Sequence, residues 1–169
     1  ENMNKENMNK ENLNADKSET ELACIILKPG FRQFEKAVVA RFSEYGKVTK
    51  RAVMILNDAI LADHYPHLIP LIGEEGFRNV CDYMKSGPVT VLQFEGKKGC
   101  IKHLRKGTGA TKDPEVGTIR YDFGIGDITR NVIHVSDSPE AGIIECNRMF
   151  RDAKKYGVKI LSSEQERTC

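Results

Sequence analysis

The sequence predicts an α/β fold of the α+β class, in which helices cover an antiparallel sheet. Three observations lead to this prediction. Short apolar, partly β-branched runs recur along the chain, longer segments with helical spacing of apolar residues separate them, and Gly or Pro stands at most boundaries. With 169 residues and 40% hydrophobic content, the chain is long and apolar enough to form one domain with a substantial core.

The first half of this domain is expected to alternate strand and helix. A strand over residues 22–27 ends at the turn signal Lys28-Pro29-Gly30. Residues 34–45 place apolar side chains on one helical face before Gly46 stops the helix, and residues 48–56 have the apolar content of a second strand.

Two helices are expected before the third strand. One begins at Asn57-Asp58 and extends to about Tyr65, and the other covers residues 76–84. Gly87-Pro88 then precedes residues 89–94, the clearest strand pattern in the chain.

The second half supplies a short basic helix over residues 100–104, a Gly/Thr-rich loop over 107–118, a strand over 131–135 and an amphipathic helix over 139–150. The resulting order is βαββαβ with helical additions. This order predicts a ferredoxin-like, four-stranded antiparallel sheet that is covered on one face.

Residues 1–20 differ in character from this domain. Glu-Asn-Met-Asn-Lys occurs twice in tandem, and a third, degenerate copy begins at Glu11. Because so polar a segment cannot bury enough apolar surface to offset its chain entropy, we expect a disordered low-complexity tail. The folded domain is expected over residues 21–150, followed by a C-terminal extension over 151–169.

Composition argues against several functional classes. The formal net charge of +2 gives no general sign of nucleic-acid or membrane binding. No apolar run approaches the roughly 20 residues that a membrane helix needs. The five cysteines lack any CxxC pairing, which is typical of free thiols in a reducing compartment and not of a disulfide framework or a zinc site. A cytoplasmic location is therefore expected.

The junction between the fourth strand and the last helix carries the most chemistry. His134 follows two apolar residues, Ser138 is placed to cap the helix, and Pro139 suits the first helical position. Because histidine as a residue type titrates near pH 6.5, its ring is mostly neutral at cytosolic pH and one nitrogen is free to attack. The alternative is a half-buried histidine with a structural role only.

Cationic and hydroxyl side chains stand at other element ends. Two arginines, a lysine and a hydroxyl that converge on a histidine suit phosphate chemistry, because arginine grips phosphate oxygens with a planar fork and lysine acts as a mobile charge. Taken singly, each would be a solvated surface group. The residues are Lys28, Arg105, Thr111 and Arg120.

The other histidines point to no metal site. His64 and His67 lie three residues apart beside Asp63, but no third ligand nearby completes a set, so structural or surface roles are expected. His103 belongs to a basic run over residues 97–106, for which a phosphate site and a solvated face are a sufficient explanation.

From about residue 21 to residue 150 the chain resembles the nucleoside diphosphate kinases. The family signature around its phosphorylated histidine, Asn-x-x-His-(Gly/Ala)-Ser-Asp-Ser, is matched by Asn131, His134, Ser136, Asp137 and Ser138. The further matches, in chain order, are Lys28-Pro29, His64-Tyr65, Ser86-Gly87-Pro88-Val89, Glu95-Gly96, Gly109-Ala110-Thr111, Gly117-Thr118-Ile119-Arg120 and Asp122-Phe123.

This resemblance implies a role for each matched residue. His134 would take the γ-phosphoryl group from a nucleoside triphosphate such as ATP and pass it to a nucleoside diphosphate, in a ping-pong reaction. Glu145, together with Ser136, would orient the histidine. The remaining matches are Lys28, Arg105, Thr111 and Arg120 for the phosphates, Asn131 for a sugar hydroxyl and Tyr65 as a wall of the site.

The resemblance also implies a cofactor and partners. Mg²⁺ would bridge phosphate oxygens of the nucleotide without a dedicated protein cage. The chain would assemble into a homo-oligomer, a hexamer or a smaller dimer-based assembly, and would have no membrane partner and no specific nucleic-acid partner.

Several residues depart from the family pattern. Lys28-Pro29-Gly30-Phe31 stands where the family has Lys-Pro-Asp-Gly. Phe77 is the candidate for the base-stacking position, with Ile72 and Val80 as alternatives. Val135 replaces a small residue directly after the histidine, where a β-branched side chain is expected to crowd the ring.

These departures leave two further hypotheses. The first is a catalytically weak or inactive member of the family that acts as a nucleotide-binding or interaction module. The second is an RNA-binding module of ferredoxin-like shape. The strands lack the aromatic pattern on which such modules stack bases, which argues against RNA binding.

Overall fold

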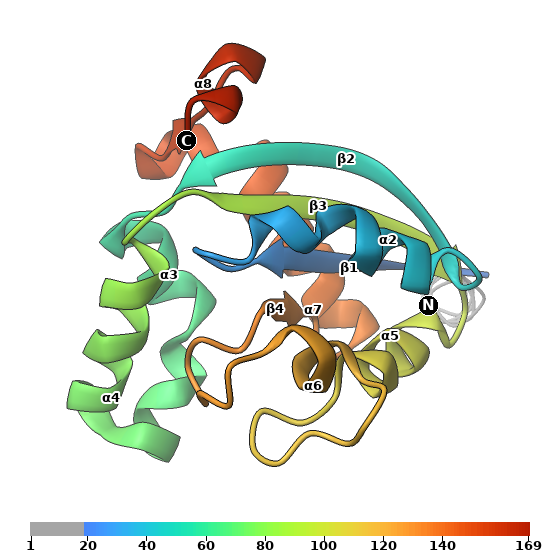
Figure 1. Ribbon diagram of the computed structural model, residues 1–169. Coiled ribbons are helices and arrows are strands. Elements are labelled where there is room, and N and C mark those ends of the chain that lie inside the picture. Colours follow the sequence, from blue (N-terminus) through green and yellow to red (C-terminus); the bar gives the residue numbers. More distant parts are fainter. Residues whose placement is uncertain (1–18) are drawn as a thin grey trace, which may run out of the picture.

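The computed structural model of the chain describes residues 19–169 (Figure 1). The predicted tail falls outside the described residues except for Glu19 and Thr20, and Thr20 already belongs to a strand. A five-stranded antiparallel sheet of order β4-β1-β3-β2-β5 forms the centre of the fold. Its strands are β1 (Thr20–Leu27), β2 (Gly46–Ile55), β3 (Val89–Lys97), β4 (Ile133–Val135) and β5 (Lys159–Ile160).

Helices connect and follow these strands. The α-helices are α2 (Glu35–Phe42), α3 (Asp58–His64), α4 (Ile69–Met84), α5 (Cys100–Thr108), α6 (Ile119–Phe123), α7 (Pro139–Cys146) and α8 (Ser163–Arg167). Shorter turns of 3-10 or π type are η1 (Arg32–Phe34), η2 (Pro66–Leu68), η3 (Asn147–Arg151) and η4 (Ala153–Tyr156).

The first four strands confirm the antiparallel βαββαβ arrangement, but the prediction of four strands is wrong. β5 pairs with Met54 and Ile55 at the outer edge of β2, and the backbone N–H of Leu161 donates to the carbonyl of Val53 at 2.8 Å. Because β5 is only two residues long, it has no alternating pattern by which the sequence alone could reveal it.

The predicted coverage of one face is also wrong, because helices cover both faces of the sheet. Ala23, Ile25 and Leu27 of β1 pack with side chains of α2 and α5. The alternate residues Cys24 and Ile26 pack with side chains of α3, α4 and α7. The helices of the βαββαβ core lie on the first face and the additional helices on the second (Figure 1). This explains why β1 is continuously apolar, as strands buried on both faces are.

Some helix boundaries differ from those predicted. α4 begins at Ile69, earlier than expected, and contains a break at Gly73, whose φ of 74° and ψ of 173° are not helical. α6 was not predicted and begins directly after the loop predicted over residues 107–118, where the Thr118 side chain caps it by accepting from the N–H of Tyr121. α7 ends at Cys146 and continues as the π-helical turn η3.

The predicted cap of α7 is confirmed. The Ser138 side chain accepts a hydrogen bond from the backbone N–H of Ala141 at 3.1 Å, and Pro139 occupies the first turn. The cap satisfies one of the free N–H groups of the first turn and fixes where the helix begins after β4.

A close backbone contact then sets α7 against the sheet. A Cβ atom added at Gly142 would lie 1.8 Å from the carbonyl oxygen of Leu22 in β1. Only glycine therefore allows the helix to approach β1 at its observed separation. Glu145 lies nearly one turn further along this helix, and the contact consequently positions its side chain.

None of the helices in residues 19–169 is both long enough and apolar enough to cross a lipid bilayer.

We expect Gly142→Ala to destabilise the fold by about 2 kcal/mol or more, because helix and strand must separate to admit the methyl group. The matched control is Gly107→Ala in α5, where an added Cβ would make an ordinary 3.5 Å contact with Phe42. Urea unfolding of both variants checks the prediction. Equal stability of the two variants would contradict the proposed close approach.

Candidate active site

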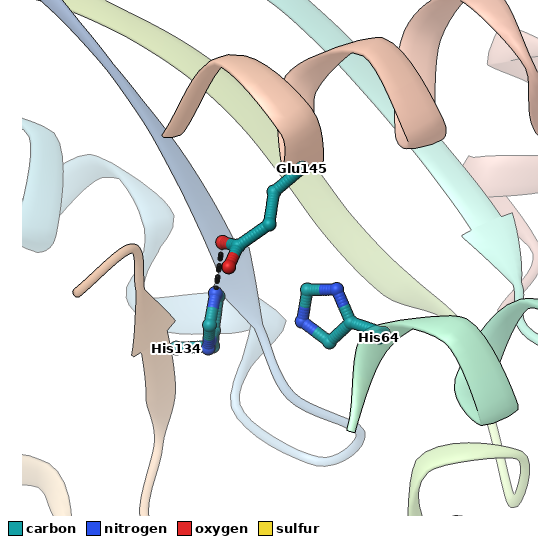
Figure 2. A group of neighbouring side chains, drawn as sticks. All are labelled: His64, His134 and Glu145. Carbon is teal, nitrogen blue, oxygen red and sulfur yellow. Dashed lines mark hydrogen bonds and ion pairs between the residues drawn. The ribbon is translucent and has the colours of Figure 1, made fainter. Parts of the chain in front are cut away.

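His134 lies in the middle of β4, where its backbone pairs with Ile26 of β1. Its side chain is 16% exposed, so the ring is sheltered but reachable. Figure 2 shows the ring beside the side chains of His64 and Glu145, which come from α3 and α7. Three elements that are distant in sequence thus meet at the imidazole.

Glu145 holds one nitrogen of this ring. His134 Nε2 lies 2.6 Å from Glu145 Oε1, and the Ser136 hydroxyl donates to the same oxygen at 2.8 Å. Ser136 Oγ also accepts from the backbone N–H of Cys24 at 2.8 Å. The carboxylate is therefore tied through Ser136 to the backbone of β1.

The charge of Glu145 decides which tautomer His134 adopts. Burial alone would raise the pKa of Glu145, but the hydrogen bonds from His134 and Ser136 and the charge of Arg148 lower it overall. An ionised carboxylate only accepts hydrogen bonds, so Nε2 of His134 carries the proton. The lone pair then remains on Nδ1, which is the nitrogen available as a nucleophile.

A strained turn precedes the strand that carries His134. Val132 has a φ of 79°, and the N–H of Ile133 donates to the carbonyl of Asn131 at 3.0 Å, which forms a γ-turn. Such a turn costs on the order of 1–3 kcal/mol for a β-branched residue. The backbone N–H of Lys28 holds it by donating to the carbonyl of Val132 at 2.9 Å. No local sequence pattern indicates this strain, because valine is among the residues least suited to positive φ.

Lys28 and Asn131 form a polar pair beside this turn. Lys28 Nζ donates to Asn131 Oδ1 at 2.6 Å and to the carbonyl of Thr129 at 3.3 Å. Burial, and then the charge of Arg120, lower the pKa of Lys28 to about 7. Lys28 is therefore partly neutral at neutral pH, and a bound anion would favour its charged form.

Arg120 braces the same segment from the other side. Its guanidinium donates to the carbonyls of Gly109, Asn131 and Ile133 at 2.8, 3.1 and 2.7 Å. Burial, and then the charge of Arg105, lower its pKa to about 10, so the group stays charged at neutral pH.

Arg105 holds the far end of β4. It donates to the carbonyl of Val135 at 3.0 Å and forms an ion pair with Asp137 at 2.7 Å. Because both side chains of the ion pair are largely exposed, the pair contributes little to stability and an anion can replace Asp137 at low cost.

Thr111 lies in the loop opposite these groups. Together with Arg120 and Asn131 it lines a hollow of about 310 Å³. The structure thus brings Lys28, Asn131, Arg120 and Thr111 to one region around the strand that carries His134.

Tyr65 and His64 line the inner side of the site. The ring of Tyr65 lies 6.3 Å from that of His134, and its hydroxyl is buried without a hydrogen-bond partner among the described residues. Burial, followed by the charge of Glu145, raises the pKa of Tyr65, so its hydroxyl stays protonated.

His64, expected to have only a structural or surface role, is buried with its ring 4.7 Å from His134. The His64-Tyr65 match was the only signal that could have pointed to it.

Phe77 packs partly into the core on the second face of the sheet. Ile72 lies against the nearby Gly76, where an added Cβ would meet its side chain at 3.0 Å. A role of Phe77, Ile72 or Val80 towards a nucleotide base stays a prediction.

The expected crowding of His134 by Val135 does not occur. Neighbouring residues of a strand point to opposite faces. Val135 is 3% exposed and packs into the core between the sheet and α5, away from the imidazole. Its β-branched side chain therefore fills the core instead of pressing on the ring.

Within the described residues, His64, His134 and Glu145 are the one cluster with metal-ligand spacing, their donor atoms lying within 4.8 Å of one another. Arg148 Nη1, however, lies 3.1 Å from His64 Nδ1, and the cations of Lys28 and Arg120 are close by. So positive a region disfavours a dication held by protein groups alone and favours an anion.

Comparisons with known proteins agree with this geometry. A family model described as "Nucleoside diphosphate kinase" matches residues 21–155. A nucleoside diphosphate kinase of Chloroflexus aurantiacus is 37% identical over 142 residues, covering 81% of this chain and 91% of that protein. One of Thermococcus kodakarensis is 38% identical over 148 residues, covering 84% and 83%.

Solved structures give the same result. A crystal structure of the Aquifex aeolicus nucleoside diphosphate kinase superposes with a TM-score of 0.67 at 27% identity, covering 78% of this chain and 95% of that one. The apo enzyme of Encephalitozoon cuniculi superposes with a TM-score of 0.69 at 28% identity, covering 77% and 88%.

The lowered pKa of Lys28 predicts a pH dependence of stability. An unfolded lysine titrates near pH 10.4, so between about pH 7 and 10.4 the unfolded chain binds more protons at this position than the native chain. The contribution of Lys28 to the free energy of unfolding therefore rises with pH across this window.

We expect Lys28→Met to remove this rise, on the order of 2–4 kcal/mol, whereas Lys106→Met at an exposed position leaves it unchanged. Urea unfolding at pH 7 and pH 9.5 measures the difference. If the free energy of unfolding had the same pH slope in the wild type and in Lys28→Met, burial would not destabilise the charged form of Lys28, and the prediction would be contradicted.

Proposed function

The chain belongs to the nucleoside diphosphate kinase family and is a phosphotransferase, and we propose that it works through a phosphohistidine at His134. It transfers the γ-phosphoryl group of a nucleoside triphosphate, ATP included, to a nucleoside diphosphate. The observation that carries this proposal is the 2.6 Å contact between Nε2 of His134 and ionised Glu145, because it leaves the lone pair on Nδ1.

Two half reactions follow from this tautomer. The Nδ1 lone pair forms a bond to the γ-phosphorus, the bond from phosphorus to the bridging oxygen breaks, and the diphosphate leaves with that electron pair. The terminal phosphate oxygen of the acceptor then attacks the same phosphorus, and the N–P bond breaks. Throughout, the Nε2 proton stays on His134 and remains hydrogen-bonded to the Glu145 carboxylate.

The cationic groups of the site suit this charge flow. Phosphoryl transfer depends mainly on in-line positioning and on cations around the equatorial oxygens. Arg105 exchanges its exposed partner Asp137 for a phosphate oxygen, and Arg120 and Thr111 lie in the hollow on the other side. Loss of one such contact typically lowers kcat by about 10²- to 10³-fold.

Lys28 and Asn131 are proposed to contact the sugar and phosphates of the nucleotide. Binding raises the pKa of Lys28 from its value of about 7, because the added negative charge favours the ammonium form. Since the groups that we assign contact phosphate and sugar only, base selectivity is expected to be broad.

Mg²⁺ is the proposed cofactor and is held mainly through phosphate oxygens of the nucleotide. The hollow is lined by Lys112 and Arg120, by the Thr111 hydroxyl and by two aspartates, Asp113 and Asp127. So few carboxylates fit a metal that keeps its own waters and needs no protein cage. When bound, Mg²⁺ neutralises phosphate charge.

We further propose that the chain forms a homo-oligomer, hexameric or dimer-based, and that its location is cytoplasmic.

The alternative of an inactive nucleotide-binding module has lost its main support. It depended on Val135 crowding the histidine and on an altered base clamp, and the first ground is removed because the Val135 side chain packs into the core between the sheet and α5.

We expect the wild type to take up one acid-labile phosphate per chain from γ-labelled ATP with Mg²⁺, and to pass it to added ADP. His134→Ala takes up none, while His103→Ala, changed at an exposed histidine, behaves as the wild type. Nucleotide binding without any labelling of the wild type would overturn the proposed mechanism.

Glu145→Gln is expected to slow labelling by about 10²- to 10⁴-fold, because an amide N–H donates to Nε2 and moves the histidine proton to Nδ1. Glu140→Gln, at an exposed position of the same helix, serves as the control. Rapid-quench measurement of the first half reaction checks the result, and an unchanged rate in Glu145→Gln would contradict the assigned role.

A further inference from the structure

We propose that His64 is a positioning residue, whose N–H edge lies against the ring of His134 and fixes the direction of Nδ1. The inference rests on the proposed role of His134 as nucleophile. His64 ends α3 and is 4% exposed. The two ring centroids lie 4.7 Å apart at an interplanar angle of 67°, and one nitrogen edge of His64 faces His134 (Figure 2).

Arg148 determines which nitrogen of His64 carries the proton. Arg148 Nη1 lies 3.1 Å from His64 Nδ1. A guanidinium can only donate hydrogen bonds, so Nδ1 must accept. The proton of the neutral ring therefore lies on Nε2.

This Nε2–H group has no conventional acceptor. His64 Nε2 is one of two buried side-chain polar atoms without a hydrogen-bond partner in the described residues, the other being the Tyr65 hydroxyl. An unpaired buried donor costs free energy, and such groups concentrate where function maintains them. An N–H edge directed at an aromatic face is a weak favourable contact, which accounts for the edge-to-face arrangement.

The contact between His64 and the ring of His134 restricts the orientation of the imidazole in a way that Glu145 alone cannot. The hydrogen bond to Glu145 fixes Nε2 and the side-chain bond to Cβ fixes the opposite end of the His134 ring, so the ring plane can still rotate only about the line that joins them. The edge of His64 on the ring face opposes this rotation. The two contacts together therefore fix the direction of the Nδ1 lone pair, on which in-line attack depends.

His64 stays neutral in this role. Burial, followed by the positive neighbours His134, Arg148, His67 and Lys28, lowers its pKa well below the ordinary value. A neutral His64 neither repels a cationic neighbour nor competes with His134 for Glu145.

One helical segment carries both Glu145, which contacts His134, and Arg148, which contacts His64. Glu145 lies near the end of α7, and Arg148 follows three residues later in the π-helical turn η3. A shift of this segment would consequently release the Glu145 hydrogen bond and the Arg148 contact with His64 together.

The test compares His64→Phe with His64→Gln. Phenylalanine keeps the ring but lacks both nitrogens, whereas glutamine retains an N–H donor and an acceptor for Arg148. We expect His64→Phe to lower the rate of His134 labelling by about 10²-fold with the KM for nucleotide changed less than about twofold. His64→Gln should recover most of that rate, and His67→Phe, at an exposed position, should match the wild type.

Two results would overturn the inference. One is a wild-type labelling rate in folded His64→Phe, and the other is an equal loss in His64→Phe and His64→Gln, which would indicate packing alone. Thermal unfolding of each variant establishes that it folds. If the wild type itself takes up no acid-labile phosphate, the proposed function fails instead, and the two failures are thereby distinguished.

Discussion

The hydrogen bond between Glu145 and Nε2 of His134 is the interaction on which the site depends. It determines the tautomer, and the tautomer determines which nitrogen can attack phosphorus. Glu145 is itself fixed by Ser136, whose hydroxyl bridges to the backbone of Cys24. The imidazole of His134, the proposed nucleophile, is therefore held in place relative to β1, the strand that is buried on both faces of the sheet.

The fold provides this arrangement at a local cost. Gly142 lets α7 approach β1 closely enough for Glu145 to reach the histidine. Val132 adopts a strained positive φ so that Asn131 faces Lys28 while Ile133 and Val135 enter the core. Carbonyls on both sides of His134 accept from Arg120 and Arg105, so the groups assigned to the phosphates also support the strand.

The sequence was sufficient to predict the βαββαβ order and the cap at Ser138, because periodicity and motif spacing are local signals. β5, the placement of α3, α4 and α7 on the second face and the strain at Val132 depend on tertiary contacts that no local pattern encodes. The expected effect of Val135 was wrong because strand alternation directs its side chain to the opposite face. The burial of His64 and its contact with Arg148 could not be predicted, because they arise only from folding.

The most direct test of the account is the tautomeric state of His134 in the free protein, measured by two-bond ¹H–¹⁵N correlation on histidine-labelled samples, with the His134 signal assigned from its loss in His134→Ala. We expect a protonated Nε2 and an unprotonated Nδ1 for the neutral ring. A neutral His134 with its proton on Nδ1 would contradict it, since Glu145 would then not hold the nucleophile in its reactive form.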